Sequence, residues 1–577
     1  MAQPTNQFTI KGNGFQGLNT EMSPIASDPS YALLADNCVI DRVGRIAARE
    51  AFASEADLGT SIWSNTDLTD ISAHYTNDGY NSYEPHPVCT ILNGTYYPLE
   101  AEVVRSTWGG VETMNEVGID SDQPYEYTLG WEQNGQINPC TYPAIDTAGL
   151  ERSLYVHFKE DLFLFSRGNS FLKYDGNGGW EDVTYTPPQT DSGNIVDKID
   201  GDVAISAYGR LWVSGVDGDY QTIYYSSLLR EDQWYDGQGT PDDAQNTAGI
   251  INVSEYWPVD FDQIVNIHAH NGFLIVLGRR SILIYANANT GDPAGENGIQ
   301  LQDAISNVGL VERDAICNIG TDVMFCDDTG LRSLARVIQE KSTPIGEPSM
   351  NVKRQFMDMI QEEERSTALV KGIKLAYFPS KSLVVCLFRT SGTAYTFSTE
   401  RPSSTGGAKT TRWTDCHYAA MYFAEDSDIG RPYLAGLNNR GVLRYEGFNS
   451  PEPYRLGFES VALGITQNSI QTVIPKSVIY IVLSPAVPVD SRARWGFGSY
   501  LDYHYDFRIR PEGTTEWGVA QFGLDEYVGG RPGIWRQKVN TIGAGEFLRV
   551  GLEIEINGSS FAIQEIAVNT AVGRIAA

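Results

Sequence analysis

Three glycines near the start of the chain have the spacing of a dinucleotide-binding loop. Gly12, Gly14 and Gly17 match the pattern G-x-G-x-x-G, in which backbone N–H groups at a helix N-terminus hold a pyrophosphate. That chemistry requires the glycines to lie between a strand and a helix. Here the chain continues through Leu18 into a proline-containing segment with no strand–helix–strand pattern. We therefore expect no nucleotide site and no bound cofactor.

Two histidines have the residue type for metal binding but no accompanying ligands. His268 and His270 are two residues apart on an expected strand, so both side chains point to the same side. A protein metal site needs at least one more ligand, and no cysteine or carboxylate motif accompanies the pair. The seven cysteines contain no C-x-x-C pair, a distribution typical of reduced thiols. We expect no metal site.

Residues 173–180 resemble the Asp-box turn of sialidase-type propellers, S-x-D-x-G-x-x-W. Asp175 and Trp180 have the required separation, whereas Lys173 replaces the serine and Asn177 the glycine. In that family the turn is a fold element outside the catalytic site, so the resemblance favours propeller blades. Glycoside hydrolysis needs two carboxylates that face each other across a pocket. The sequence identifies neither such a pair nor a G-x-S-x-G motif. We therefore expect no catalytic residues and expect that the protein is not an enzyme.

The charge balance excludes several classes of function. The 577 residues include 73 acidic and 42 basic ones, which gives a net charge of −31. A protein that grips nucleic acid through its phosphates needs a basic surface, and an anionic membrane repels an acidic protein. The start of the chain has no apolar signal segment, and the apolar runs are shorter than the ~18 residues that span a bilayer. We expect neither secretion nor stable membrane association.

The elements that must position these residues are predominantly strands. From residue 151 onward an apolar strand, a polar turn and a second strand recur at intervals of 44 to 61 residues, starting at Leu154, Val203, Ile264, Ala315, Ile373 and His417. A period near 50 is typical of propeller blades of the kelch length class. We predict an all-β chain that contains a β-propeller of about six blades. Two β-sandwiches in series are the alternative.

One substantial helix is expected near residues 350–365. Four apolar residues fall on one face at helical spacing: Val352, Phe356, Met359 and Ile360. Ser349 stands where an N-cap is expected. The apolar face predicts packing against the fold rather than a groove for a partner.

Composition divides the chain into four regions. Residues 1–52 form an N-terminal segment, and residues 53–150, rich in Asn, Tyr, Thr, Gly and Pro, are expected to be an irregular β insertion with long loops. The propeller is expected over 151–450 and a C-terminal β domain over 451–577, so β-rich platform segments flank the propeller. The Asn-Gly pair at 557–558, between two apolar runs, predicts a hairpin with a type I′ turn.

A distinctive set of residues occurs within the first fifty: Phe15, Gly17, Leu18, Asn19, Asn37, Asp41, Gly44 and Arg49. This set resembles the N-terminal signature of tail tube, or nozzle, proteins of short-tailed bacteriophages (podoviruses), namely tubular tail protein B and its packaged-DNA-stabilising relatives. The segment Ile223-Tyr-Tyr-Ser226, followed by Gln233-Trp234, also resembles the first blades of that family. After Arg49 the chain departs from the family, because Ala51 stands where a glycine is usual.

The resemblance implies a structural protein of the virion tail, assembled in the cytoplasm of the host bacterium. It implies a homohexamer, a six-fold ring below the head-to-tail adaptor ring and in contact with tail fibres or other tail proteins. The ring would gate and conduct double-stranded DNA during genome ejection, and residues 1–52 would hold the ring and its adaptor together. The acidic excess predicts a channel wall that repels the duplex. The alternative function is a propeller-type tail enzyme, or a carbohydrate-binding protein, acting on a host surface glycan.

Overall fold

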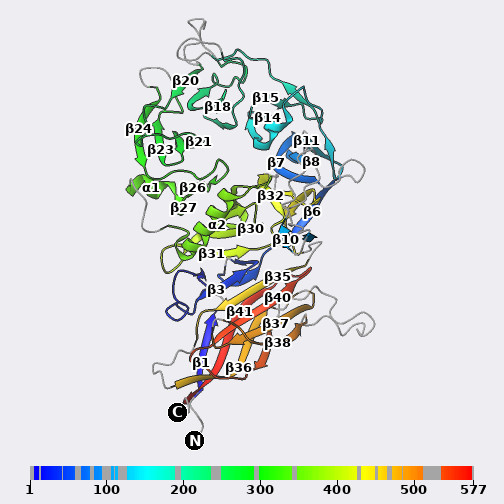
Figure 1. The fold of residues 1–577 in the computed structure, drawn as a ribbon, viewed down its shortest axis with the longest axis vertical. Helices are drawn as coiled ribbons and strands as arrows, with labels where there is room; N and C mark the ends of the chain where they lie inside the picture. The colour runs from blue at the N-terminus through cyan, green and yellow to red at the C-terminus, as the bar shows by residue number, and fades with distance from the viewer. Residues whose placement is uncertain are drawn as a thin grey trace.

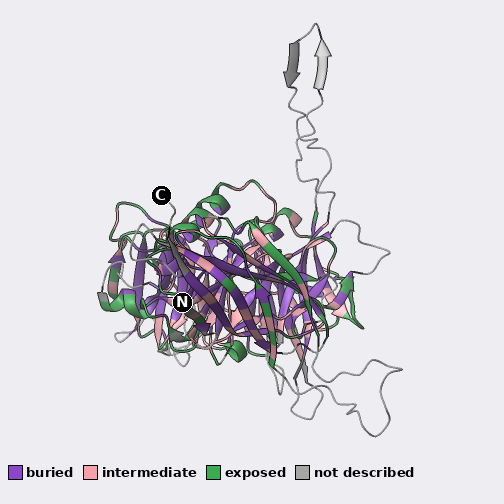
Figure 2. Ribbon diagram, turned by 90° about the horizontal axis from the view of Figure 1, so that it is seen from below, coloured by how far each residue is buried: buried purple, intermediate pink, exposed green. Residues whose placement is uncertain are grey.

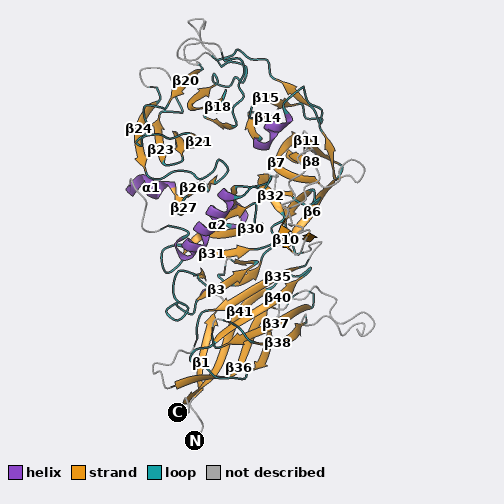
Figure 3. Ribbon diagram, viewed as in Figure 1, coloured by secondary structure: helices purple, strands orange, loops and turns teal. Residues whose placement is uncertain are grey.

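Strands dominate the computed structural model of the chain, at 57% against 7% in helices, which confirms the all-β prediction (Figure 3). In the part of the chain that the structure describes, no helix is long and apolar enough to cross a membrane. The structure describes residues 5–11, 14–41, 43–58, 66–77, 83–93, 105–108, 111–114, 126–188, 196–234, 248–290, 298–340, 347–424, 431–448, 453–463, 471–483, 485, 487–498, 500–510 and 534–574.

Small antiparallel sheets surround a common axis in one half of the molecule and form a β-propeller (Figure 1). Blade 2 contains β13–β16 (Leu154–Phe158, Asp161–Ser166, Asn169–Tyr174, Trp180–Asp182) and blade 3 contains β17–β20 (Val203–Ala207, Arg210–Val216, Asp219–Tyr225, Gly249–Asn252). Blade 4 contains β21–β24 (Ile264–His270, Phe273–Gly278, Ser281–Ala286, Gln300–Ser306) and blade 5 contains β25–β27 (Ile316–Asn318, Val323–Asp327, Gly330–Ser333). Blade 6 contains β28–β31 (Ile373–Phe378, Leu383–Phe388, Thr393–Pro402, Ala408–Trp413). Each of these blades begins within one residue of a predicted repeat start.

Another blade comes from the region that we expected to be an irregular insertion. Blade 1 contains β7 (Thr66–Asn77), β8 (Tyr83–Asn93), β11 (Glu126–Gln133) and β12 (Gln136–Pro139), and a hairpin of β9 (Arg105–Trp108) and β10 (Val111–Met114) is inserted between β8 and β11. Blade 7 combines β32–β34 (Tyr418–Ala424, Arg431–Gly436, Val442–Tyr445) with β6 (Phe52–Leu58), which pairs with β34.

The described residues therefore form seven blades rather than about six, and the propeller begins at residue 52 rather than at 151. The insertion between β8 and β11 interrupts the period of blade 1, which hides this blade in the sequence. The fourth strand of blade 7 comes from the opposite end of the propeller sequence, so it has no position in a local repeat.

Apolar clusters fill the space between successive blades and show that the ring closes. Buried positions are concentrated along the strands (Figure 2). Leu129 of blade 1 and Leu164 of blade 2 belong to one buried cluster. On the other side, Ile91 of blade 1 and Val442 of blade 7 belong to another. Because strand residues alternate between the two faces of a sheet, each blade buries both faces against its neighbours.

The N-terminal and C-terminal regions together form one β-sandwich beside the propeller. Its basal sheet contains β1 (Thr5–Lys11), β4 (Cys38–Ile40), β5 (Ile46–Ala48), β36 (Gln471–Leu483), β39 (Ile534–Asn540) and β41 (Ala562–Arg574). Its joining sheet contains β2 (Gly17–Leu18), β3 (Tyr31–Asp36), β35 (Tyr454–Ser460), β37 (Val489–Gly496), β38 (Tyr503–Ile509) and β40 (Arg549–Ile556). The joining sheet is continuous with blade 6, because β3 lies next to β31.

The predicted hairpin at residues 557–558 is wrong. β40 pairs with β35 and β37, whereas β41 pairs with β1 and β36, so the connection crosses from one sheet of the sandwich to the other. Gly558 has a φ of 73°, but Asn557 does not take the positive φ that a type I′ turn requires. The crossing lets Ile554 and Ile566 bury their side chains in one shared core.

The predicted helix is present as α2 (Lys353–Arg365), preceded by the 3-10 turn η4 (Met350–Val352). Phe356 and Ile360 are buried. Ser349 does not cap the helix with its side chain, because its Oγ accepts the N–H of Leu331 at 3.0 Å. The other described helical elements are α1 (Leu334–Glu340), η2 (Thr147–Arg152) and η5 (Pro379–Lys381).

Candidate functional site

The N-terminal signature residues lie where the sandwich meets the propeller. Phe15 and Leu18 are buried, and the Phe15 ring contacts the Phe458 ring edge-on, with 6.1 Å between the centroids. Gly17 has a φ of 95°, and a Cβ at this position would lie 2.6 Å from the backbone nitrogen of Thr410 in β31. Only glycine fits both the conformation and the space. β2 can therefore pack closely against blade 6.

Asn37 and Arg49 form the centre of this junction. The Arg49 Nε donates to the Asn37 Oδ1 at 3.0 Å, and the same oxygen accepts the N–H of Thr414 at 3.0 Å. The guanidinium carbon of Arg49 lies 4.3 Å from the centroid of the Phe52 ring and 4.1 Å from that of the Tyr454 ring. Arg49 is only 2% exposed, so these rings and hydrogen bonds stabilise the cation in place of water.

The other three signature residues hold turns. Asn19 is buried, and its Oδ1 accepts two backbone N–H groups that follow it, both at 3.2 Å. Asp41 accepts the backbone N–H of Arg45 at 2.8 Å and the Nε of the same arginine at 2.7 Å. Gly44 has a φ of 86°, within the turn that joins β4 to β5. All eight signature positions thus have a role in holding this chain's own fold.

Residues 1–52, expected as an N-terminal ring- and adaptor-docking segment, are integrated into the sandwich and the propeller, and their contact with an adaptor stays a prediction. β1, β4 and β5 belong to the basal sheet, β2 and β3 belong to the joining sheet, and Phe52 begins the strand that completes blade 7. Signature side chains that are buried inside the chain cannot contact an adaptor directly. What they do is fix the orientation of the sandwich on the propeller.

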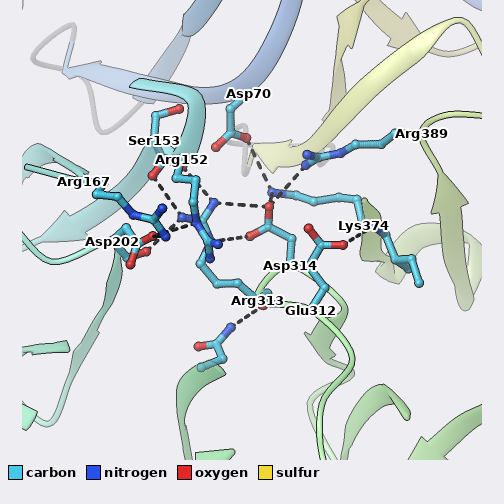
Figure 4. Close-up of polar contacts among 12 residues, drawn as sticks. Asp70, Arg152, Ser153, Arg167, Asp202, Glu312, Arg313, Asp314, Lys374 and Arg389 are labelled. Atoms are coloured by element: carbon cyan, nitrogen blue, oxygen red, sulfur yellow. Dashed lines mark hydrogen bonds and ion pairs between the residues drawn. The ribbon is translucent and has the colours of Figure 1, made fainter. Parts of the chain in front are cut away.

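A second candidate site, which the sequence analysis missed, is a charged network at one end of the propeller (Figure 4). Arg313, in the connection between blades 4 and 5, reaches toward blades 2 and 3. Its Nη1 donates to the backbone oxygen of Asp202 at 2.9 Å, and its Nη2 donates to that of Ser153 at 3.0 Å. The Arg313 side chain is 7% exposed. This arginine therefore links three blades across the mouth of the propeller.

Asp314 is the anionic centre of the network. Its carboxylate accepts the Arg313 Nε at 2.9 Å and the Arg389 Nη2 at 3.2 Å, and the Lys374 Nζ lies 3.7 Å away. Burial alone would raise the pKa of Asp314, but the three cations hold that pKa well below its usual range. Lys374 also lies 3.5 Å from the carboxylate of Asp70 in blade 1. Five of the seven blades therefore take part in the network.

A cavity of about 120 Å³ lies beside this network. Its charged lining residues are Asp70, Glu151, Arg152, Glu312, Arg313, Asp314, Lys371 and Arg389. Burial raises the pKa of Glu312, and the nearby Arg389 opposes this shift. Binding pockets for small molecules are typically about 300–1,000 Å³, so this cavity is too small for a sugar chain. The arrangement binds blades together and presents no activated nucleophile.

The sequence contains a weak signal for this network. Three consecutive charged residues, 312–314, directly precede the first strand of blade 5. The sequence does not predict that these three residues are buried. Their partners come from segments as far apart as residues 70 and 389, and no regular sequence spacing relates them.

His157 and His268 each lie on the first strand of a blade. The Nε2 of His157 in β13 lies 3.2 Å from the Ser72 Oγ and 3.1 Å from the Tyr422 hydroxyl oxygen, and burial lowers the pKa of His157 to about 4. Burial, together with the neighbouring His270, also lowers the pKa of His268 to about 4. Among the described residues, no group of three or more His, Cys, Asp and Glu side chains is arranged to hold a metal ion.

The glycine pattern at residues 12–17 and the Asp-box-like turn at residues 173–180 are the two remaining motifs. Gly12 lies outside the described residues, and Gly17 begins the short strand β2 rather than preceding a helix. In the Asp-box-like turn between β15 and β16, the Asp175 Oδ1 accepts the N–H groups of Asn177 at 2.7 Å and Gly179 at 2.8 Å. Trp180 is buried behind this turn. This motif is a fold element of blade 2.

Comparisons with known proteins give no family for this chain. No family model and no curated protein matches it. Among solved structures, it is similar to the extracellular domain of a putative one-component system from B. thetaiotaomicron (11% identity, TM-score 0.33, 76% of this chain and 48% of the other). It is also similar to the WD40 domain of Toxoplasma gondii coronin (9%, TM-score 0.33, 72% and 86%). A third likeness is to the periplasmic gluconolactonase of Pseudomonas aeruginosa (11%, TM-score 0.28, 56% and 92%). The chain spans about half the length of the first of these structures.

Proposed function

We propose that this protein is a structural component of the tail nozzle of a short-tailed bacteriophage. Six copies form a ring that gates and conducts double-stranded DNA during genome ejection, below a head-to-tail adaptor ring and next to tail fibres or other tail proteins. The observation that carries the proposal is the junction built by the signature residues. The positions that resemble the nozzle family are the ones that join the sandwich to the propeller.

A rigid junction is a physical requirement of such a ring. Neighbouring copies close a ring only if each copy holds its contact surfaces at one fixed angle. The stacked Arg49 and the close approach of Gly17 to Thr410 leave little freedom between the two parts of the chain. The signature residues are mostly buried, and they would serve assembly by fixing the angle between the sandwich and the propeller.

The alternative function, a glycan-cleaving or glycan-binding propeller, finds less support. The carboxylates that line the cavity of about 120 Å³ are Asp70, Glu151, Glu312 and Asp314. Asp70 and Asp314 share the Lys374 ammonium, and Asp314 also accepts hydrogen bonds from Arg313 and Arg389. A retaining or inverting glycosidase keeps an acid and a base free to face the sugar.

Electron microscopy of the purified protein tests the proposal. We expect end-on views of a six-fold ring with an axial channel, and labelling of the protein at the tail of intact virions. A protein that stays monomeric at all concentrations and in the presence of its virion partners would overturn the proposal. So would sustained cleavage of a host polysaccharide that a single carboxylate substitution abolishes.

A further inference from the structure

The outward face of the basal sheet contains a row of aliphatic residues. Tyr480 in β36 points into the sandwich, where its hydroxyl donates to the backbone oxygen of Gly551 at 2.9 Å. Successive strand residues point to opposite faces, so Ile479 and Ile481 point outward, as does Leu483. These three side chains are half-buried, although no described strand of the sandwich covers this face.

The neighbouring edge strand β39 continues this face and adds cations to it. In the pairing of β39 with β36, Ile534 lies opposite Leu483, Arg536 opposite Ile481 and Lys538 opposite Ile479. Ile534 is 51% exposed, and both cations are exposed. Among the described residues β39 has no partner on its other side. The result is an aliphatic row beside an open, positively charged edge.

Among the described residues, the two cations of β39 on this face form no ion pair, unlike those of the opposite sheet. Arg536 and Lys538 are exposed and form no ion pair within the described part of the chain, and Glu565 of β41 lies on the same face, opposite Ile481. On the outward face of the joining sheet, by contrast, Arg492 pairs with Asp506 at 2.6 Å and Arg494 pairs with Glu553 at 2.5 Å. Two neighbouring cations with no ion pair among the described residues are unusual in a chain with a net charge of −31.

We propose that this face binds an acidic surface of a second copy of the same chain, and that this contact builds the ring. The inference rests on the proposed function and names the surface through which it works. An apolar centre with a charged border has the composition of a protein interface. A surface that reads duplex DNA would place its cations along the face itself to reach phosphates.

The charges also determine the symmetry of the contact. A two-fold contact centred on the β39 edge would bring Arg536 and Lys538 of one copy near the same cations of its partner, which like-charge repulsion opposes. The complementary surface is therefore a different, acidic region of the next copy. Such head-to-tail contacts generate a closed ring when the rotation between copies closes.

The test uses the full chain and two matched double variants. Arg536→Glu with Lys538→Glu reverses the charge of the basal face. Arg455→Glu with Arg508→Glu makes the same change in charge on the joining sheet, where these side chains are 68% and 58% exposed. A third variant, Ile534→Ser, removes an apolar contact without adding charge. Sedimentation velocity and native mass spectrometry report the oligomeric state, and thermal unfolding confirms that each variant folds.

We expect the wild type and the Arg455/Arg508 variant to form the same ring. The Arg536/Lys538 variant should sediment as a monomer with an unchanged unfolding temperature, and Ile534→Ser should shift the assembly midpoint to at least tenfold higher protein concentration. A ring that persists in both basal-face variants overturns this inference and leaves the proposed function standing. A wild type that never forms a ring overturns both. Loss of duplex DNA binding in the Arg536/Lys538 variant, with no change in mass, assigns the face to DNA and overturns the inference.

Discussion

Arg313 and Asp202 are 111 residues apart in the sequence, yet the Nη1 of the arginine donates to the backbone oxygen of the aspartate at 2.9 Å. This bond joins the start of blade 5 to the start of blade 3 and places a buried cation across the mouth of the propeller. Charged side chains therefore gather at this end of the propeller, beside a cavity of about 120 Å³. In the ring that we propose, DNA passes through the opening enclosed by the six copies, not along the axis of one propeller.

Replacing Arg313 by methionine should lower the free energy of unfolding by about 3–5 kcal/mol, because the network loses a buried cation and three backbone oxygens lose their donor. Urea-induced unfolding followed by tryptophan fluorescence measures the change. The control is Arg230→Met, which removes an exposed ion pair with Asp232 and should cost less than about 1 kcal/mol. Equal losses in both variants would contradict the role of Arg313.

Truncating Phe356 to alanine should destabilise the fold by about 3–5 kcal/mol, since the side chain is fully buried. Its ring contacts the rings of Phe388, Tyr395 and Phe397 with centroid distances of 5.4, 5.6 and 5.7 Å. Thermal unfolding of Phe356→Ala and of the exposed-site control Glu362→Ala checks this. A loss below about half a kcal/mol would mean that the helix does not pack as the structure shows.

Gly17→Ala should destabilise the junction by about 1–3 kcal/mol, because an alanine must adopt a φ of 95° and approach the Thr410 backbone. Gly14 belongs to the same glycine pattern, but a Cβ there meets nothing within 4 Å, so Gly14→Ala should be nearly neutral. Limited proteolysis at the sandwich–propeller boundary, together with thermal unfolding, distinguishes the two. If the two variants behave alike, the close approach at Gly17 is not what holds the junction.

Stability should fall as the pH is lowered from about 6.5 to about 4. The folded protein holds the pKa of His157 near 4, whereas an unperturbed histidine titrates at 6.5, so the unfolded chain binds more protons between these values. This histidine contributes about 3 kcal/mol that is present above pH 6.5 and lost below it, and His268 acts in the same direction. Urea midpoints measured across this range should fall less steeply for His157→Gln. The exposed-site control His504→Gln should match the wild type, and an unchanged slope for His157→Gln would contradict the prediction.

The free protein should show no measurable binding to duplex DNA at ~0.15 M salt, where the Debye length is about 8 Å. Each chain has a net charge of −31, and this excess repels phosphates and lets a duplex slide instead of being held. In an assembled ring, Asp and Glu should outnumber Lys and Arg on the channel wall. Fluorescence anisotropy of a labelled duplex tests the first statement. Tight, salt-sensitive binding by the free protein would contradict this prediction and show that the channel wall binds the DNA phosphates.

The local pattern of the sequence determined many elements of this protein. The apolar runs with a period near 50 placed the starts of blades 2 to 7 within one residue, and the stripe through Phe356 and Ile360 placed the helix. These signals arise among near neighbours, because strand alternation and helical spacing depend on residues two to four apart. The resemblance of the N-terminal signature to the nozzle family stays a prediction.

Only the tertiary structure decided which strands pair and which side chains are buried. The closing strand of blade 7 pairs Ala56 with Val442, and the strands on either side of Asn557 enter different sheets, although both choices are compatible with the local sequence. Arginine side chains are usually exposed at the surface. Arg49 and Arg313 are nevertheless buried, by aromatic rings and backbone oxygens from distant segments. Burial of complementary apolar faces determines long-range pairing, and an arginine can leave water only where those faces bring enough acceptors and rings together.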